Sequence, residues 1–145
     1  MSLIHGSCGL IYFVHEWQPR FNESALLDDV EMLGAVTRIN ARIHALAPVL
    51  NAPTQSDAVT VVSSDPDVPI ASLVKSYRGD VYVFAVAMRP GTTEARFSLR
   101  PGAKAVRVED IEEDRVVPLV DGAFTDTFAD WQVRLYRLVM AEPSP

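Results

Sequence analysis

Histidine, cysteine and serine are the residue types in this sequence best suited to metal binding or nucleophilic chemistry. The three histidines, His5, His15 and His44, lie far apart, and neither an HExxH pattern nor paired cysteines accompany them. Residues 6–9 (Gly-Ser-Cys-Gly) lack the G-x-S-x-G spacing of an activated serine. Cys8 is the only cysteine, which excludes an internal disulfide, and its apolar neighbours predict a buried, unreactive thiol. We therefore expect no metal site and no cofactor.

Three charged stretches are explained more simply as turns than as sites. Asp65-Pro66-Asp67 offers oxygen ligands that suit calcium, but proline between two aspartates is typical of a capped turn. Residues 78–80 (Arg-Gly-Asp) match an adhesion tripeptide, but glycine between two apolar runs predicts a hairpin. The acidic residues 109–114 predict a hairpin turn that faces water.

Three aromatic residues provide one further candidate for ligand binding. Trp131, Tyr136 and Tyr82 would form a sugar-binding platform if they shared an exposed face. Their neighbours in the sequence are apolar, and this favours packing in a core instead.

Composition and charge exclude several classes of partner. The 145 residues suit one domain, or one small domain with an appendage, and 48% of them are hydrophobic. The net charge of −6, without any cluster of Lys or Arg, predicts no binding to nucleic acid. The longest apolar run, residues 10–14, is too short to cross a membrane, and no signal peptide is visible at the start. We expect a soluble protein, and the sequence does not indicate its cellular compartment.

The first part of the chain, residues 1–50, predicts one strand followed by one helix. Residues 10–14 are apolar without alternation, which is typical of a strand covered on both faces in a parallel sheet. Asp28 or Asp29 caps the helix, and Pro48 ends it. The helix carries one apolar stripe, formed by Leu33, Val36, Ile39, Ile43 and Leu46.

The second part, residues 51–145, predicts an antiparallel β-sandwich. Short apolar or alternating segments recur about every ten residues between turn signals, as they do in sandwiches. The expected strands cover residues 59–62, 70–77, 81–88, 105–111, 116–120, 123–128 and 132–139. The fold class is therefore mainly β, with one strand and one amphipathic helix before the sandwich.

A strand of the parallel type needs a neighbouring strand, and the helix that follows it completes only half of a βαβ unit. Residues 9–17, 22–29 and 31–50 resemble the end of a glycoside hydrolase (β/α)8 barrel: its eighth strand, the loop after it and its final helix. Residues 71–88 and 126–138 resemble the central hairpin and closing strand of the sandwich that often follows such barrels.

The resemblance implies that this chain is not an enzyme by itself. Retaining glycosidases use two carboxylates about 5 Å apart, and in barrels of this kind both lie on strands that precede the eighth. The catalytic pair would then lie upstream of Met1, and we expect no catalytic residue in this chain. His15, Glu16 and Trp17 would lie at the carboxyl end of a barrel strand, where Trp17 stacks on a sugar ring. The alternatives are that Trp17 packs beneath a loop and that Glu16 is solvated.

We therefore expect a non-catalytic accessory region that packs on the catalytic barrel of its parent protein and stabilises it. One alternative is a free-standing domain that binds carbohydrate or another protein. In that case residues 10–14 pair with an edge of the sandwich or with a second copy, and a dimer forms. A third alternative is a small enzyme whose site is not recognised.

Overall fold

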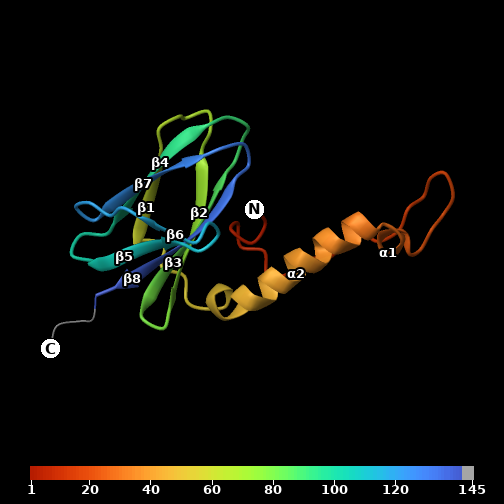
Figure 1. The fold of residues 1–145 in the computed structure, drawn as a ribbon, viewed down its shortest axis with the longest axis horizontal. Helices are drawn as coiled ribbons and strands as arrows, with labels where there is room; N and C mark the ends of the chain where they lie inside the picture. The colour runs from red at the N-terminus through yellow and green to blue at the C-terminus, as the bar shows by residue number, and fades with distance from the viewer. Residues whose placement is uncertain (142–145) are drawn as a thin grey trace.

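Eight strands and two helices form in the computed structural model, which describes residues 1–141. The two helices come first and all the strands follow, as Figure 1 shows. In chain order the elements are α1 (Ala25–Asp28), α2 (Val30–Leu50), β1 (Val59–Ser63), β2 (Ile70–Tyr77), β3 (Asp80–Ala87), β4 (Thr93–Leu99), β5 (Ala105–Asp110), β6 (Arg115–Val117), β7 (Ala123–Phe128) and β8 (Val133–Met140).

The strands form two antiparallel sheets that face each other. One sheet has the order β1-β4-β7 and the other has the order β2-β3-β8-β5-β6. A shared core of buried side chains fills the space between the sheets. At its centre the Phe97 ring stacks on Phe124 with 4.6 Å between centroids, and Tyr136 meets both rings edge-on. The predicted β-sandwich is therefore confirmed.

Strand β4 is the one strand that the sequence analysis did not name. Its side chains alternate, since Thr93, Ala95 and Phe97 are buried whereas Glu94 and Arg96 are exposed. This two-residue period is the sequence signal of a strand with one face on a core. The segment lies in the middle of its sheet, between β1 and β7. Polar or charged residues alternate with the apolar ones and lower the mean hydropathy of the segment, so the segment does not stand out as an apolar run.

The turn between β2 and β3 confirms the hairpin predicted at residues 78–80. Tyr77 pairs with Asp80, which leaves Arg78 and Gly79 as a two-residue loop. Both loop residues have positive φ, 52° at Arg78 and 88° at Gly79. This is the type I′ conformation, whose twist matches that of the flanking strands.

Helix α2 begins as predicted but ends later. The Asp29 side chain accepts a hydrogen bond from the Met32 backbone N–H at 2.9 Å, which caps the first turn. The prediction that Pro48 ends the helix is wrong, because the helix continues to Leu50. Pro48 lies in the last turn, and the Asn51 N–H still reaches the Ala47 carbonyl at 3.0 Å. The helix therefore accommodates the Pro48 ring in its last turn, where only two helical residues follow the proline.

The C-terminal half of α2 packs on the outer face of the five-stranded sheet. Val49 of the helix, Phe84 of β3 and Leu135 of β8 form a second, smaller cluster of buried side chains. Phe84 points away from the main core because its neighbours Val83 and Ala85 point into it. Strand β3 is thus covered on both faces, which explains its unbroken apolar sequence.

The expected strand over residues 10–14 does not form. These residues are irregular and mostly exposed, and they join neither sheet. They lie along the projection that α1 and the first half of α2 form, which extends away from the sandwich (Figure 1). The physical reason is the one that the sequence raised: a strand requires a hydrogen-bonding neighbour, and none pairs with this segment within residues 1–141. We call residues 10–40 the arm.

Candidate functional site

The three residues singled out for sugar contact, His15, Glu16 and Trp17, lie together in a loop of the arm. Glu16 and Asn22 exchange two backbone hydrogen bonds, of 3.0 and 2.9 Å, which close the loop. The Leu26 N–H also donates to the Val14 carbonyl at 3.2 Å, so the loop folds back on α1. All three side chains are exposed, including Trp17, which packs beneath no loop.

Aromatic rings gather around this loop. His15 lies 5.3 Å from Phe13 and 5.7 Å from Phe21 between ring centroids, and the second pair is stacked. Trp17 lies 4.9 Å from Phe21 in a tilted arrangement. The rings contact one another, but Phe13 is 73% exposed and Trp17 is 68% exposed. This cluster therefore presents apolar surface to solvent instead of forming a core.

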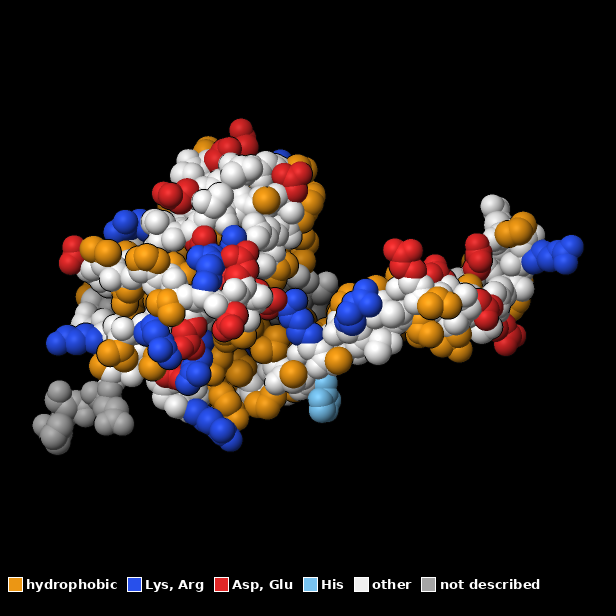
Figure 2. All heavy atoms as spheres, viewed as in Figure 1, with side chains coloured by type: hydrophobic (Ala, Val, Ile, Leu, Met, Phe, Trp, Pro, Cys, Tyr) orange, Lys and Arg blue, Asp and Glu red, His pale blue; other side chains and the backbone are white. Residues whose placement is uncertain are grey.

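The arm carries a disproportionate share of the exposed apolar side chains. Ten of the 18 exposed large hydrophobic residues lie within its 31 residues. Figure 2 shows hydrophobic side chains gathered along the lower side of the arm, with acidic side chains above them and at the tip. Exposed patches of this kind mark interaction sites on soluble proteins. The ten residues are Leu10, Ile11, Tyr12, Phe13, Trp17, Phe21, Leu27, Val30, Met32 and Ile39.

The predicted stripe of α2 is only partly covered. Leu46 packs against the cluster on the outer sheet face, whereas Ile39, farther along the helix, is exposed. The prediction that Cys8 is buried is wrong, since its thiol is exposed beside the start of the arm. In both cases the residues that the structure describes supply no surface to cover the side chain.

The charges of the arm are mostly acidic. It holds five carboxylates and two arginines. None of the five carboxylates forms an ion pair among the residues that the structure describes. The carboxylates belong to Glu16, Glu23, Asp28, Asp29 and Glu31, and all of them are exposed.

The aromatic trio considered as a sugar platform does not share a face. Tyr136 is fully buried in the core, as predicted. Tyr82 packs with the cluster on the outer sheet face. Trp131 lies half-exposed in the turn before β8, with a φ of 56° that is rare for a large side chain. The structure therefore brings no two of these rings together.

The acidic stretch 109–114 forms a hairpin, but one of its acids does not face water. Asp110 pairs with Arg115 across the β5–β6 turn, and its side chain is only 1% exposed. Its Oδ1 accepts the Glu112 N–H at 3.0 Å, and its Oδ2 accepts Nη1 of Arg134 at 2.9 Å. Burial is possible because charge-assisted hydrogen bonds replace the lost water. The burial of Asp110 therefore depends on Arg134, which lies on β8.

A second, partly buried carboxylate joins the same network. Asp126 accepts a hydrogen bond from the Tyr136 hydroxyl at 2.8 Å and forms ion pairs with Arg115 and Arg134. Asp110 and Asp126 thus share both of their arginine partners. An acid–base pair for glycoside hydrolysis needs a carboxylic acid that can donate a proton. Two arginines between the carboxylates instead form a structural ion network.

The pKa shifts agree with this structural role. Burial lowers the pKa of Arg134, but Asp126 and Glu113 outweigh this effect, so its pKa lies above the ordinary value. The Arg115 hydrogen bond lowers the pKa of Glu113. Burial, and then the hydrogen bond to Asp126, raises the pKa of the Tyr136 phenol well above its usual range. The three pKa shifts therefore favour a charged Arg134, an ionised Glu113 and a neutral Tyr136, which are the states that form these hydrogen bonds and ion pairs.

The remaining candidate sites are turns. The Asp67 N–H donates to Oδ1 of Asp65 at 2.8 Å, and the Val68 N–H donates to the Asp65 carbonyl at 3.1 Å. These bonds confirm the capped turn. Within residues 1–141, no group of three or more His, Cys, Asp or Glu side chains is arranged to hold a metal ion.

The fold and the arm define the class: a β-sandwich that carries a helical arm with an uncovered apolar face. No protein-family model matches the chain, and no curated protein matches it. Neither α1 nor α2 combines the length and the apolar character that crossing a bilayer requires.

Proposed function

We propose that this chain is a non-catalytic accessory region of a glycoside-hydrolase-like protein, in which the arm packs on the catalytic barrel and stabilises it. The observation that carries the proposal is the concentration of exposed apolar side chains on the arm. Because burying apolar surface contributes about 25 cal/mol per Å², an uncovered face of this kind favours contact with a second apolar surface.

The exposure of the arm's side chains supports contact with a folded barrel rather than with an unstructured segment. Ile11 is fully exposed, and Phe13 is 73% exposed. A segment with apolar side chains on both faces suits a sheet that is covered on both sides, as barrel strands are. The acidic side chains beside it favour a partner surface with lysines or arginines at its edge.

The ion network supports a non-catalytic role for the sandwich. Asp110 and Asp126 are the first candidates for an acid–base pair, because the side chain of Asp110 is buried and that of Asp126 is only 11% exposed. Their oxygens are engaged by arginines and by Tyr136. The sandwich then serves as a rigid base for the arm.

The alternative is a free-standing interaction domain in which the arm binds a second copy or a carbohydrate. The exposed Trp17 ring beside Phe21 favours this reading, because aromatic faces stack on sugar rings. On either reading His15, Glu16 and Trp17 are the proposed sugar-contacting residues. A Trp17→Ala variant should then lose any saturable sugar binding, whereas the half-exposed Trp131→Ala variant should keep it.

The coding sequence immediately upstream of Met1 tests the main proposal. A continuous frame of about 250 or more codons that encodes a barrel with two catalytic carboxylates would support it. A stop codon directly before Met1 would refute it.

Activity provides the second test. The chain by itself should hydrolyse no member of a panel of chromogenic glycosides, and measurable turnover would overturn the proposal. In the longer protein, replacement of Ile11 and Phe13 by serine should lower the melting temperature of the barrel. Replacement of Val62, which is exposed on the sandwich, is the matched control and should leave that temperature unchanged.

A further inference from the structure

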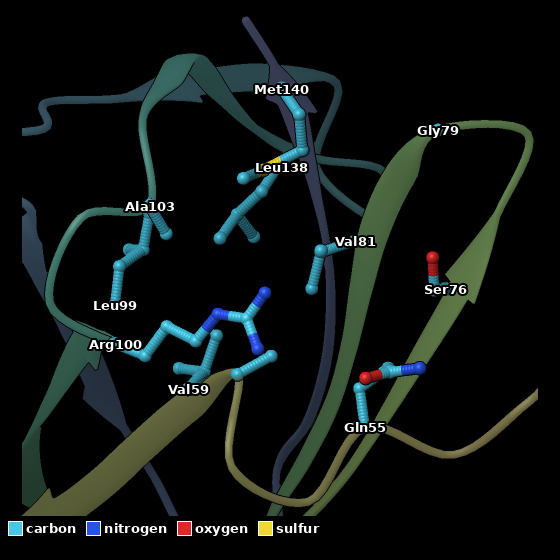
Figure 3. Close-up of a pocket in the computed structure, with 11 residues that line it drawn as sticks. Gln55, Val59, Ser76, Gly79, Val81, Leu99, Arg100, Ala103, Leu138 and Met140 are labelled. Carbon is cyan, nitrogen blue, oxygen red and sulfur yellow. The ribbon is translucent and has the colours of Figure 1, made fainter. Parts of the chain in front are cut away.

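A cavity of about 320 Å³ opens at one end of the sandwich, remote from the arm. It lies between the two sheets, and its walls come from β1 and β4 on one side and from β2, β3 and β8 on the other. Figure 3 shows the apolar side chains of Leu99, Leu138, Met140, Val59 and Val81 around it. Its volume falls at the lower end of the range for small-molecule pockets.

The floor of this cavity is apolar and buried. Leu138 is fully buried and Val59 is 4% exposed, and both belong to the main core. Ser76 follows Val74 by two residues on β2, so it shares the inward face of that strand. A polar side chain thus faces inward at this end of β2.

Arg100 supplies the single cation of the cavity lining. Its guanidinium lies across the opening, between Val59 and Val81, as Figure 3 shows. Its one ion pair within the described residues is with Asp57, at 3.7 Å, and both side chains are largely exposed. An exposed ion pair of this kind contributes little to stability. The Arg100 guanidinium can therefore leave Asp57 and pair with an anionic ligand.

We propose that this cavity binds a small amphipathic carboxylate, whose anionic group pairs with Arg100 and whose alkyl chain lies against the partly exposed side chains of Val81 and Leu99. The lining contains no aromatic ring, which disfavours a sugar. One cation is too few for a polyphosphate, whereas a guanidinium matches a single carboxylate in a bidentate geometry. This proposal is independent of the accessory role of the chain.

The test is titration of the full chain with octanoate, followed by NMR of the methyl groups. We expect saturable shifts at Val81, Leu99 and Met140, with a Kd of about 1 mM for so small a ligand. Octanol and octylamine, which have the same chain length, should bind more weakly because one lacks the negative charge and the other reverses it.

Two substitutions should move the affinity in opposite directions. Arg100→Gln should weaken octanoate binding about tenfold, because it removes a charge-assisted hydrogen bond. Asp57→Asn should strengthen binding a few-fold, by about the worth of an exposed ion pair, because it removes the competing carboxylate. Arg96→Gln is the matched control: Arg96 is exposed on β4, the strand that ends just before Arg100, but it does not line the cavity.

Three results would overturn the proposal. The first is the absence of saturable shifts at 10-fold the expected Kd. The second is an affinity that Arg100→Gln leaves unchanged, which would show that the cavity is only a gap in packing. The third is a set of shifts confined to the arm, which would show non-specific binding to its apolar face.

Discussion

Asp110 and Arg134 are the two ionisable side chains that the sandwich buries most deeply within residues 1–141, apart from the phenol of Tyr136. Removing a charge from water costs several kcal/mol unless a partner compensates. Here one Oδ2 of Asp110 receives hydrogen bonds from both Arg115 and Arg134, each at 2.9 Å. The same carboxylate also holds the β5–β6 turn through the Glu112 N–H. One residue therefore satisfies a buried cation and shapes a loop.

Replacement of Asp110 by alanine should destabilise the protein by about 3 kcal/mol, because it leaves the Arg134 charge buried with fewer partners. Urea denaturation measures this change as a lower midpoint. The control is Asp67→Ala, since Asp67 is exposed and its side chain lies in a surface turn. If Asp110→Ala lowered the free energy of unfolding no more than the control does, the ion network would contribute nothing to stability.

Tyr136 gives the molecule a predictable response to alkali. Its pKa is raised in the folded state, above the ordinary value of about 10 that holds in the unfolded chain. The stabilising effect is therefore fully present below pH 10. It is lost as the pH rises further, because only the unfolded chain then releases the proton.

Stability measured between pH 9 and pH 11.5 should fall more steeply in the wild type than in Tyr136→Phe. The difference in slope should approach about 1.4 kcal/mol per pH unit, the value for one proton. Tyr136→Phe should also be less stable at pH 7, because it loses the hydrogen bond to Asp126. Parallel slopes for the two proteins would contradict the assignment.

At the scale of elements, helix α2 has two unlike halves. Its C-terminal half rests on the outer sheet face through Val49 and Leu46, and Arg42 forms an ion pair with Glu112 near the middle. Its N-terminal half contacts α1, and the Tyr12 hydroxyl donates a hydrogen bond to the Asn40 side chain at 3.0 Å. Most helical stability in proteins comes from packing of an apolar face, so the two halves should differ in stability.

Hydrogen exchange should reveal this difference. Amides of residues 34–40 should exchange at least about tenfold faster than those of residues 43–50, since exchange follows local opening. Amides of β3, which is buried on both faces, provide the reference for full protection. Equal protection along the whole of α2 would mean that the exposed half is held by contacts other than those described.

For the whole molecule, the uncovered face of the arm predicts self-association whenever no other partner is present. We expect light scattering and sedimentation to show a dimer or larger species whose share grows with protein concentration. A double replacement, Ile11→Ser with Phe13→Ser, should shift the population toward monomer. Val62→Ser on the sandwich should not. A strictly monomeric mass for the wild type at all concentrations would contradict this prediction.

Local sequence patterns were enough to predict most of the elements. Strand β2 has the bounds that its composition indicates, and Arg78-Gly79 forms the predicted hairpin turn. The Asp29 cap of α2 was also recognisable. Each of these features depends on residues within a few positions of one another, where propensity and backbone geometry act directly. Strand β4 also carries its alternating pattern in the local sequence.

The burial of particular side chains depends on residues that are distant in sequence. Asp110 was expected in water, yet Arg134, 24 residues later, makes its burial possible. Cys8 and residues 10–14 were expected to be covered because they are apolar, yet they lie in solvent. The order of apolar and polar residues along the chain by itself determined that it forms a β-sandwich with a capped amphipathic helix. Only the tertiary structure decided which apolar surface finds a partner, because burial requires a second surface at the right place in space.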